Sequence, residues 1–435
     1  MDWPWNFLVY SIILSLPALL FLIPRRSSNL GHDRLPPGPP GLPLFRNMHL
    51  KHKFGPVIWL RLGARNTMVI QSAKAAANLF KNHDISFAGR TTTEASQVYD
   101  YHKGSLALAP YGSHWRVLRR LVTVDMLVNK RINEMAFIRK KFLEKLQLWI
   151  EEEASKLKEG HGVHVARFVF LTSFNLLGNL MLSKDLVDPN SKEGLEFFTA
   201  MTGMIEWNGH ANMADFFPWP WWLDPQGLKR KMKMDLGKAL KIAARFVRQR
   251  MKDKQLGWIS DHDVNIFILE IFLAGSETTS STIEWALTEL LCNPEKLIKA
   301  KAELTQVIGP SCRKIEEGDI EKLPYLQGII RETLRLHPPI PFLIPRKVFV
   351  NAYAIGRDPD VWDDETALFK PERRVCAGLP LAHTMLHLTL GMLLHQFDWE
   401  LGGDVTRGNI EWKDKLGITM RKSEPLLAVP RKCLV

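Results

Sequence analysis

The spacing of hydrophobic positions is helical along most of this chain. A different pattern occurs early, where VIWLRLG from Val57 and NTMVIQS from Asn66 form two short β-rich runs around a polar turn. Such runs predict a hairpin of strands. From there to residue 345 helical spacing dominates, and no internal repeat is visible. The pattern therefore predicts a mainly α fold with small β-sheets.

The first apolar segment has the properties of a membrane anchor. Phe7–Ile23 carries no charge, and its seventeen residues are followed by Arg25 and Arg26. As a helix they span about 25 Å, close to the hydrocarbon core of a bilayer, with Trp3 and Trp5 placed to lie at the interface. The arginines predict that the rest of the chain is cytosolic. A cleaved signal peptide is the alternative, but the segment lacks a basic n-region and a small-residue cleavage site.

A spacer separates this anchor from the remainder. Residues 27–45 are basic and proline-rich, with PPGPPGLP at Pro36–Pro43. Proline at this density excludes helix and sheet interiors and predicts a semi-rigid linker. We therefore divide the chain into an anchor at 1–26, spanning the membrane at about 7–23, a linker at 27–45, and a catalytic domain at 46–435.

Composition excludes several classes of protein. With 46% hydrophobic and 24% charged residues the chain is globular. The net charge is +12, but the basic residues are interleaved with 46 acids, so no compact nucleic-acid surface is predicted. A basic face toward an acidic partner or an anionic membrane fits better. The four cysteines are scattered without a CxxC pair, which argues against a disulfide framework or zinc ribbon.

The strongest helical pattern begins at Ser260 and runs through Leu291, about 45 Å of helix. SDHD at its start resembles a capping box with Asp263 at the reciprocal position. In its middle, AGSETT (Ala274–Thr279) places a glycine and polar groups where they cost stability. Glu277 and Thr278 could open the helical ladder, hold a water and relay protons. The alternative is a threonine bonded back to its own helix.

Two further motifs place polar pairs on helices. In YGSHWRVLRR, Trp115 and Arg119 are four apart and could present an indole N–H and a guanidinium to one anion, with a solvated basic face as the alternative. In LQGIIRETLRLHPP, Glu332 and Arg335 are three apart. Because that helix is rich in leucine and isoleucine, the pair is predicted to be structural and partly buried rather than a simple surface ion pair.

A cysteine precedes the last strong helical pattern, in FKPERRVCAGLPLAH (Phe369–His383). Cys376 would face the positive end of that helix, and Arg373 and Arg374 would lower its thiol pKa further. That arrangement suits a thiolate ligand. A buried structural cysteine is the alternative.

In this order WRVLR, AGSETT, ETLR and RRVCAG make the chain resemble the cytochrome P-450 family of haem-thiolate monooxygenases, from the anchor to the C-terminus. The PPGPPG hinge, FKPER and the FFPWPWWLDP loop are most similar to the plant microsomal A-type branch, whose members act on terpenoids, phenolics and alkaloids. The resemblance implies the cytochrome P-450-like helical fold, with small β-sheets and an N-terminal membrane helix.

The resemblance also implies haem b as cofactor. Cys376 would be the axial ligand of the haem iron, and Thr278, helped by Glu277, would deliver protons during oxygen activation. Further haem contacts would come from Trp115, Arg119, Arg346, Arg374 and Gly378. Glu332, Arg335 and Arg373 would form a buried structural triad.

The same resemblance sets the expected partners and location. No GxGxxG fingerprint occurs, so electrons would come from NADPH through a separate NADPH-cytochrome P-450 reductase. The catalytic domain would lie on the cytosolic side of the endoplasmic reticulum membrane. The pocket for a small hydrophobic substrate would be lined or gated by the residues between Phe87 and Leu108, by the Phe216 loop and by Ile340–Ile344.

The cysteine loop departs from the family pattern F-x-x-G-x-R-x-C-x-G. Phe369, Arg374, Cys376 and Gly378 keep the spacing, but Glu372 stands where the glycine belongs. Family members are longer, and here FKPER runs directly into RVCAG. A Cβ and a negative charge beside a thiolate predict impaired haem incorporation. The alternative function is therefore an inactive, haem-deficient splice or gene-model variant of the same family.

A third possibility is a metal-dependent hydrolase using His383 and His387, which are four apart. HTMLH lacks the glutamate of HExxH, and the sequence offers no third ligand.

Overall fold

The computed structural model describes residues 54–83, 85–158, 160–188, 191–217, 224–251, 260–309, 313–342, 348–356, 379–403 and 405–433. Contacts divide the chain into residues 1–37 and residues 38–435, and every described residue belongs to the second unit. The predicted anchor and linker lie outside the described residues.

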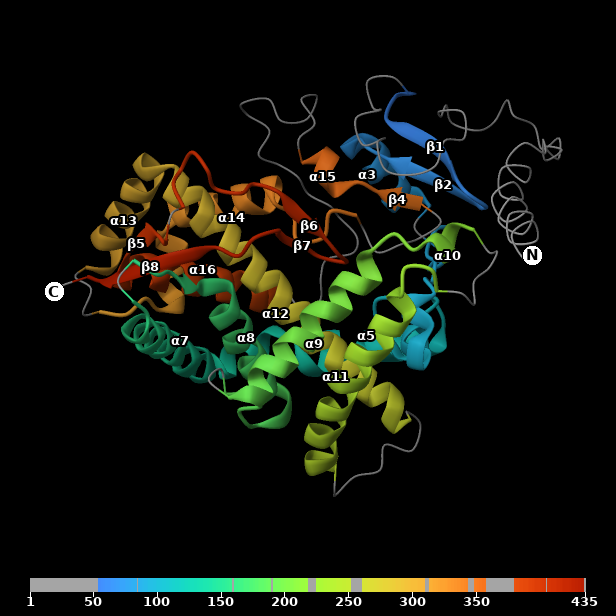
Figure 1. Ribbon diagram of the computed structural model, residues 1–435, viewed down its shortest axis with the longest axis horizontal. Helices are drawn as coiled ribbons and strands as arrows, with labels where there is room; N and C mark the ends of the chain where they lie inside the picture. The colour runs from blue at the N-terminus through green and yellow to red at the C-terminus, as the bar shows by residue number, and fades with distance from the viewer. Residues whose placement is uncertain are drawn as a thin grey trace, which may run out of the picture. The chain divides into compact units, whose positions relative to one another are not determined.

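Helices make up most of the described chain (Figure 1). The α-helices are α3 (Ala73–Asn82), α4 (Tyr101–Gly104), α5 (Ser113–Arg120), α6 (Asn129–Glu134), α7 (Ala136–Lys156), α8 (Val165–Leu182), α9 (Lys192–Gly209), α10 (Met213–Phe216), α11 (Leu228–Met251), α12 (Asp261–Cys292), α13 (Pro294–Ile308), α14 (Pro324–Leu336), α15 (Ala352–Ile355) and α16 (Leu379–Gln396). Two 3-10 helices, η2 (Ala95–Asp100) and η5 (Glu317–Lys322), and one π-helix, η3 (Leu121–Met126), complete the helical part. The predicted mainly α fold is confirmed.

The strands form small sheets, also as predicted. The first sheet has the order β1-β2-β4, with β1 (Val57–Leu62) antiparallel to β2 (Arg65–Ile70) and β2 parallel to β4 (Val348–Val350). The others are β3 (Val163–His164), β8 (Leu427–Lys432) and β5 (Phe397–Leu401) in that order, and the pair β6 (Asp414–Leu416) and β7 (Met420–Lys422). The hairpin predicted at Val57 is thus β1 and β2, in which Trp59 lies opposite Met68.

The core is organised around α12, which packs against α8, α16, α11 and α14 (Figure 1). Ser260 caps it as expected, because its Oγ accepts the backbone N–H of Asp263 at 3.1 Å. The glycine of AGSETT has a packing reason. A Cβ on Gly275 would lie 2.7 Å from Cδ1 of Leu177 in α8, so a side chain at this position would displace the Leu177 side chain that packs against the glycine.

Among the described residues, α8 is the one helix long and apolar enough to cross a membrane. However, 78% of that window is buried inside the protein. A helix that is apolar on all sides and buried on all sides is a core helix, and the packing of α8 between α7 and α12 accounts for its composition.

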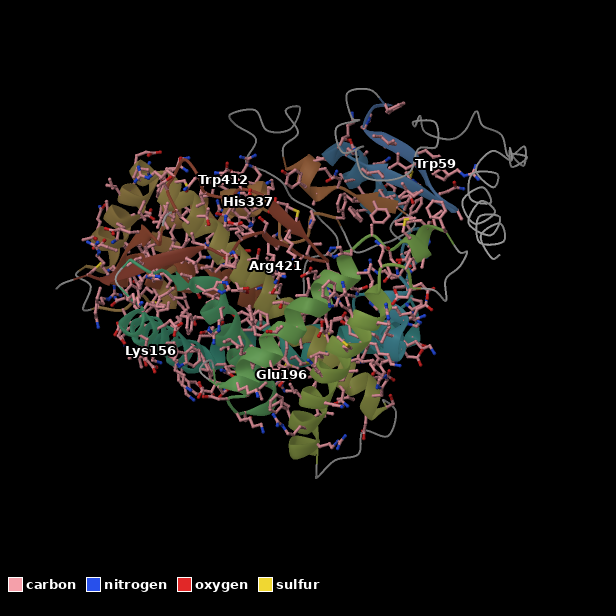
Figure 2. All side chains as sticks on the ribbon, in the orientation of Figure 1. Trp59, Lys156, Glu196, His337, Trp412 and Arg421 are labelled. Atoms are coloured by element: carbon pink, nitrogen blue, oxygen red, sulfur yellow. The ribbon has the colours of Figure 1, made fainter. Side chains whose placement is uncertain are left out.

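The far ends of α12 and α14 are joined by an aromatic stack. His337, which follows α14, lies face to face on Trp285 of α12, with ring centroids 3.9 Å apart and planes 6° apart, and Nε2 of His337 lies 2.8 Å from Glu289 Oε1. Trp412 lies on the same cluster, 6.2 Å from Trp285 (Figure 2). This contact fixes the helix that carries Glu332 and Arg335 relative to α12.

Candidate active site

The centre of α12 presents one unusual face. From Asp263 to Cys292 every residue is buried or half-buried except Ala274, which is exposed. Glu270, Ala274 and Thr278 are spaced by four and therefore share that face. An exposed small residue in the middle of a core helix indicates a surface against which a ligand can lie, and the polar residues of AGSETT are placed beside it.

Thr278 is half-buried on this face, and its hydroxyl donates to the carbonyl oxygen of Ala274 at 2.7 Å. This is the alternative considered for the motif, a threonine bonded back to its own helix. The bond uses the single hydroxyl proton and holds the oxygen in place, while its lone pairs can still accept.

The neighbouring Glu277 points elsewhere, because successive residues of a helix are about 100° apart. Its carboxylate is buried and accepts a 3.5 Å hydrogen bond from Oγ1 of Thr419, near β7. Burial raises the pKa of Glu277, and Arg421 and Thr419 oppose that shift in part. The two predicted proton-relay residues are therefore adjacent in sequence but contact different elements.

Glu277 lines a polar cavity of about 250 Å³ between α8, α9, α12 and the segment around β7. A second glutamate, Glu284, lies two turns further along α12, and Arg421, labelled in Figure 2, lines the same cavity. Burial raises the pKa of Glu284 to about 7, and its Oε1 accepts the backbone N–H of Leu426 at 2.8 Å. Sequence reasoning missed Glu284. The available signal was a second glutamate seven residues after Glu277 in an apolar helix.

The helix α5 carries both Trp115 and Arg119, as predicted. Both are half-buried. The indole N–H of Trp115 donates to the carbonyl oxygen of Leu106 at 2.8 Å. The N–H of Leu106 in turn donates to Glu270 of α12. The structure thus connects α5 to α12 through the 105–107 segment.

Glu332 and Arg335 form the predicted pair within α14. The Arg335 fork grips both oxygens of Glu332, and its Nη1 also donates to the carbonyl oxygen of Gly356 at 2.9 Å. The hydrogen bond to Arg335 is the largest cause of a lowered pKa at Glu332. The pair is partly buried, because the Arg335 side chain is 22% exposed and the Glu332 side chain 56%. The triad with Arg373 stays a prediction, because Arg373 lies outside the described residues.

Several predicted site residues lie outside the described residues. They are Arg346, Arg373, Arg374, Cys376 and Gly378, together with residues 218–223 of the aromatic loop and Leu343 and Ile344. Their roles remain predictions.

The hydrolase alternative gains no support. His383 and His387 lie on one face of α16 with ring centroids 4.1 Å apart, but Nδ1 of His387 lies 2.6 Å from the backbone oxygen of His383. Burial lowers the pKa of both rings. Within the described part of the chain, no three histidine, cysteine or acidic side chains cluster in a way that could hold a metal ion.

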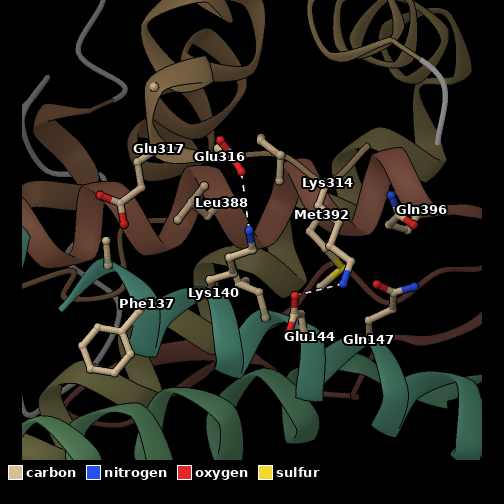
Figure 3. Close-up of a pocket in the computed structure, with 14 residues that line it drawn as sticks. Phe137, Lys140, Glu144, Gln147, Lys314, Glu316, Glu317, Leu388, Met392 and Gln396 are labelled. Atoms are coloured by element: carbon tan, nitrogen blue, oxygen red, sulfur yellow. Dashed lines mark hydrogen bonds and ion pairs between the residues drawn. The ribbon is translucent and has the colours of Figure 1, made fainter. Parts of the chain in front are cut away.

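A cavity of about 350 Å³ lies at a separate place, between α7, residues 314–318 and α16 (Figure 3). Four of its charged side chains form two pairs, Lys140 with Glu316 at 3.5 Å and Lys314 with Glu144 at 3.0 Å, and the fifth, Glu317, pairs with Arg139 outside the lining at 2.6 Å. It shares no lining residue with the exposed face of α12. This cavity is therefore separate from the candidate site at α12.

Comparison with known proteins defines the class first. The structure resembles a zebrafish cytochrome P450 solved with progesterone, with a TM-score of 0.71 over 88% of this chain and 98% of that chain. At 21% identity this likeness establishes the fold alone. The described molecule therefore has the cytochrome P450 fold.

The sequence then gives the family. The Cytochrome P450 family model matches residues 41–373. Cytochrome P450 76A2 of Solanum melongena is 43% identical over 99% of this chain and 100% of its own length. An iridoid oxidase and a geraniol 8-hydroxylase, both of Catharanthus roseus, are 42% and 34% identical, each with at least 97% of both chains covered. The chain belongs to the cytochrome P450 family and is a cytochrome P450 enzyme by descent and fold.

Two details of these matches concern the length of the chain. The alignment with the 76A2 protein extends over 506 positions, whereas this chain has 435 residues, so parts of that relative have no counterpart here. This agrees with the expectation that family members are longer. The family match ends at residue 373, three residues before Cys376, and the shortened cysteine loop stays a prediction.

Proposed function

We propose that this chain is a membrane-anchored monooxygenase that inserts one oxygen atom of O2 into a small hydrophobic substrate of the terpenoid class. The observation that carries the proposal is the exposed Ala274 beside Thr278 on an otherwise buried helix, in a chain of the cytochrome P450 family. The relatives named as an iridoid oxidase and a geraniol 8-hydroxylase support the substrate class.

The described residues fit a haem on this face. Ala274 adds only a methyl group, so a flat apolar ring can lie against α12, and Arg119 of α5 supplies a cation for carboxylate side arms. Arg346 and Arg374 would join Arg119 at those side arms, and Cys376, in the segment that contains Gly378, would supply the thiolate that holds the iron. The indole N–H of Trp115 donates to the Leu106 carbonyl oxygen, so in this structure it does not serve the haem contact expected of Trp115. When bound, a haem with a thiolate ligand activates dioxygen by favouring O–O cleavage.

The protein's own part is to position groups and move protons. The bond from Thr278 to Ala274 holds the hydroxyl oxygen at the exposed face, where its lone pairs can accept a hydrogen bond. The hydroxyl would pass on its own proton after rotating away from the Ala274 carbonyl. Glu277 and Glu284, both with raised pKa values, line the polar cavity on the adjacent face of α12. Protonated carboxyls there would act as the proton reservoir for Thr278.

Electrons would come from NADPH through NADPH-cytochrome P-450 reductase. The anchor at 1–26 would hold the catalytic domain on the cytosolic side of the endoplasmic reticulum membrane. Deleting residues 1–26 should release the protein from microsomes at alkaline pH, where the full chain stays in the membrane pellet. Retention of the shortened chain in the pellet would contradict this anchoring.

The experiment that tests the function uses microsomes that contain the full chain and the reductase. Geraniol is supplied with NADPH under ¹⁸O2, and products are analysed by mass spectrometry. We expect a geraniol product that carries one ¹⁸O atom and is absent when the reductase is omitted. A haem-loaded chain that oxidises neither geraniol nor any other terpenoid alcohol offered would contradict the substrate class.

A second candidate is a haem-deficient protein of the same fold. It is favoured by Glu372, which stands where the family loop has glycine, and by the end of the family match at residue 373. The haem spectrum distinguishes the two candidates, as described in the Discussion.

A further inference from the structure

Glu270 is a buried carboxylate in α12, one turn before the exposed Ala274. It takes no part in the proton relay described above. Three donors from one segment converge on it. The Ser105 hydroxyl donates to Oε1 at 2.5 Å, the Leu106 N–H donates to Oε2 at 2.5 Å, and the Ala107 N–H lies 3.3 Å from both oxygens.

These three donors require a carboxylate at position 270. A carboxylate is an acceptor only and has room for all three, whereas an amide would turn an N–H₂ group toward backbone N–H donors. Burial raises the pKa of Glu270, and the Ser105 hydroxyl, the two backbone N–H groups and Arg90 oppose that shift. The hydrogen bonds of Ser105, Leu106 and Ala107 therefore share one acceptor, the Glu270 carboxylate, which is 163 to 165 residues away in the chain.

Independent contacts show that the same segment lies flat along α12. Nε2 of His262 is 2.7 Å from the carbonyl oxygen of Tyr99, at the first turn of α12. A Cβ on Gly104 would lie 2.9 Å from Oδ1 and 3.2 Å from Cα of Asp263, so a side chain here would push the segment and α12 apart by a few tenths of an ångström. Glu270 is the last contact of this series before the exposed face.

The 105–108 segment also contacts α5, which carries two of the predicted haem-contact residues. The carbonyl oxygen of Leu106 accepts the indole N–H of Trp115, so the residue that Glu270 holds also holds α5. Ala107 and Leu108 follow directly and pack into the core cluster that contains Leu269 and Phe272 of α12. The segment belongs to the residues expected to line the substrate pocket, so its displacement would alter that lining and would move the tryptophan of α5 with it.

We propose that Glu270 is a positioning residue that fixes the 105–108 segment against α12 and thereby sets which substrates the site accepts. The effect on substrate selection rests on the proposed function, because it assumes a terpenoid substrate. The role of Glu270 in fixing the 105–108 segment does not depend on the proposed function.

Amide hydrogen exchange of the full chain tests the anchoring without requiring haem or turnover. In Glu270→Gln, the Leu106 and Ala107 amides should exchange about tenfold faster or more, because hydrogen bonds to a charged acceptor are among the stronger ones in proteins. Glu303→Gln is the matched control. Glu303 also accepts two successive backbone N–H groups, those of Tyr325 and Leu326 at 2.8 and 2.9 Å, but at the start of α14.

Faster exchange at 105–108 in Glu270→Gln but not in Glu303→Gln is the expected result. Unchanged exchange at these amides, or an equal rise across the whole chain in both variants, would overturn the anchoring. Gly104→Ala provides a second test of the anchoring, since it leaves Glu270 intact but displaces the 105–108 segment. Hydrogen exchange at the same amides should become faster in this variant.

Substrate selectivity is measured by titration calorimetry as the ratio of the dissociation constants of two terpenoid alcohols of different size, geraniol and drimenol. Glu270→Gln should change the ratio of the two dissociation constants about fivefold or more, because a displaced wall alters the fit of the two probes unequally. Glu303→Gln should leave the ratio unchanged. A loosened segment with an unchanged ratio would overturn the selectivity part. A wild-type chain that binds both probes but oxidises neither would contradict the proposed reaction and leave the positioning role standing.

Discussion

Glu277 and Thr278 are neighbours in α12, yet the hydroxyl of Thr278 bonds to Ala274 on the exposed face while the carboxylate of Glu277 accepts from Thr419 near β7. Adjacency in the sequence suggests a single unit. In this protein the two residues instead lie on different sides of one helix, Thr278 at the face of the exposed Ala274 and Glu277 at a buried cavity.

Thr278→Ala should uncouple NADPH consumption from product formation. Without the hydroxyl, product formed per NADPH consumed should fall by about tenfold or more, in the range of general acid–base effects. Thr278→Ser, which keeps the hydroxyl, is the control and should retain most of the coupling. Equal coupling in the alanine variant and the wild type would remove Thr278 from the relay.

The double variant Glu277→Gln with Thr278→Ala tests whether the two residues form one route. If they do, the double variant should be no worse than the poorer single variant, since residues that act as a unit have non-additive effects. The measurement is the product-to-NADPH ratio of the three variants and the wild type. Multiplicative losses would show that the residues act separately.

The pH dependence of stability should carry the signature of Glu284. Its folded-state pKa, about 7, lies above the ordinary value of 4.5, so the native state favours the neutral acid. The resulting stabilisation is complete below pH 4.5 and is lost as the pH rises through about 7. Glu284→Gln keeps an acceptor for Leu426 N–H and cannot ionise. Its free energy of unfolding should therefore exceed that of the wild type by about 3 kcal/mol above pH 7, and match it near pH 4.5.

Urea unfolding of the detergent-solubilised wild type and variant, from about pH 4.5 to about pH 8, measures this difference. Comparison at each pH cancels the titration of groups common to both proteins. A difference that does not change with pH would show that Glu284 titrates normally.

Arg335→Lys should destabilise the fold although it keeps the charge. Lysine cannot grip both oxygens of Glu332 while also donating to the Gly356 carbonyl, so about 1–2 kcal/mol of unfolding free energy should be lost. Arg331→Lys is the matched control on the same helix, where Nη2 makes a single exposed hydrogen bond to Gln327. Equal losses in the two variants would show that the fork of Arg335 adds nothing specific.

Local patterns predicted much of the fold from sequence. The β1–β2 hairpin, the length of α12 and its Ser260 cap all follow from residues close together in the chain. Asn293 shows where such reasoning stops. Asparagine directly before a proline at the first helical turn is typical of a helix cap, but the amide of Asn293 donates back to the Glu289 carbonyl instead of capping α13.

The site was less predictable because its contacts are long-range. The motifs located α5 and the centre of α12, but nothing local indicated that Glu277 would face Thr419, 142 residues away, or that Glu270 would hold Ser105. Gly275 was interpreted as a sign of function, whereas the structure gives it a packing role against Leu177. Such pairings depend on tertiary packing, which spacing rules do not describe.

Glu372→Gly should raise the haem content of the purified chain. The substitution restores the glycine of the family loop and removes a Cβ and a negative charge near the Cys376 thiolate. Haem per polypeptide, measured by the pyridine haemochrome assay, should increase about twofold or more if the loop is the limiting element. Glu365→Gly, upstream of Phe369, is the control. An unchanged haem content in Glu372→Gly would show that Glu372 does not limit incorporation.

The central claim is that Cys376 holds a haem, and the carbon monoxide difference spectrum of reduced microsomes tests it most directly. We predict a red-shifted Soret band of thiolate-ligated haem, at less than one haem per chain, that is lost in Cys376→Ala and retained in Cys433→Ala. The absence of any haem band from the wild-type chain, or a band that survives in Cys376→Ala, would contradict the claim.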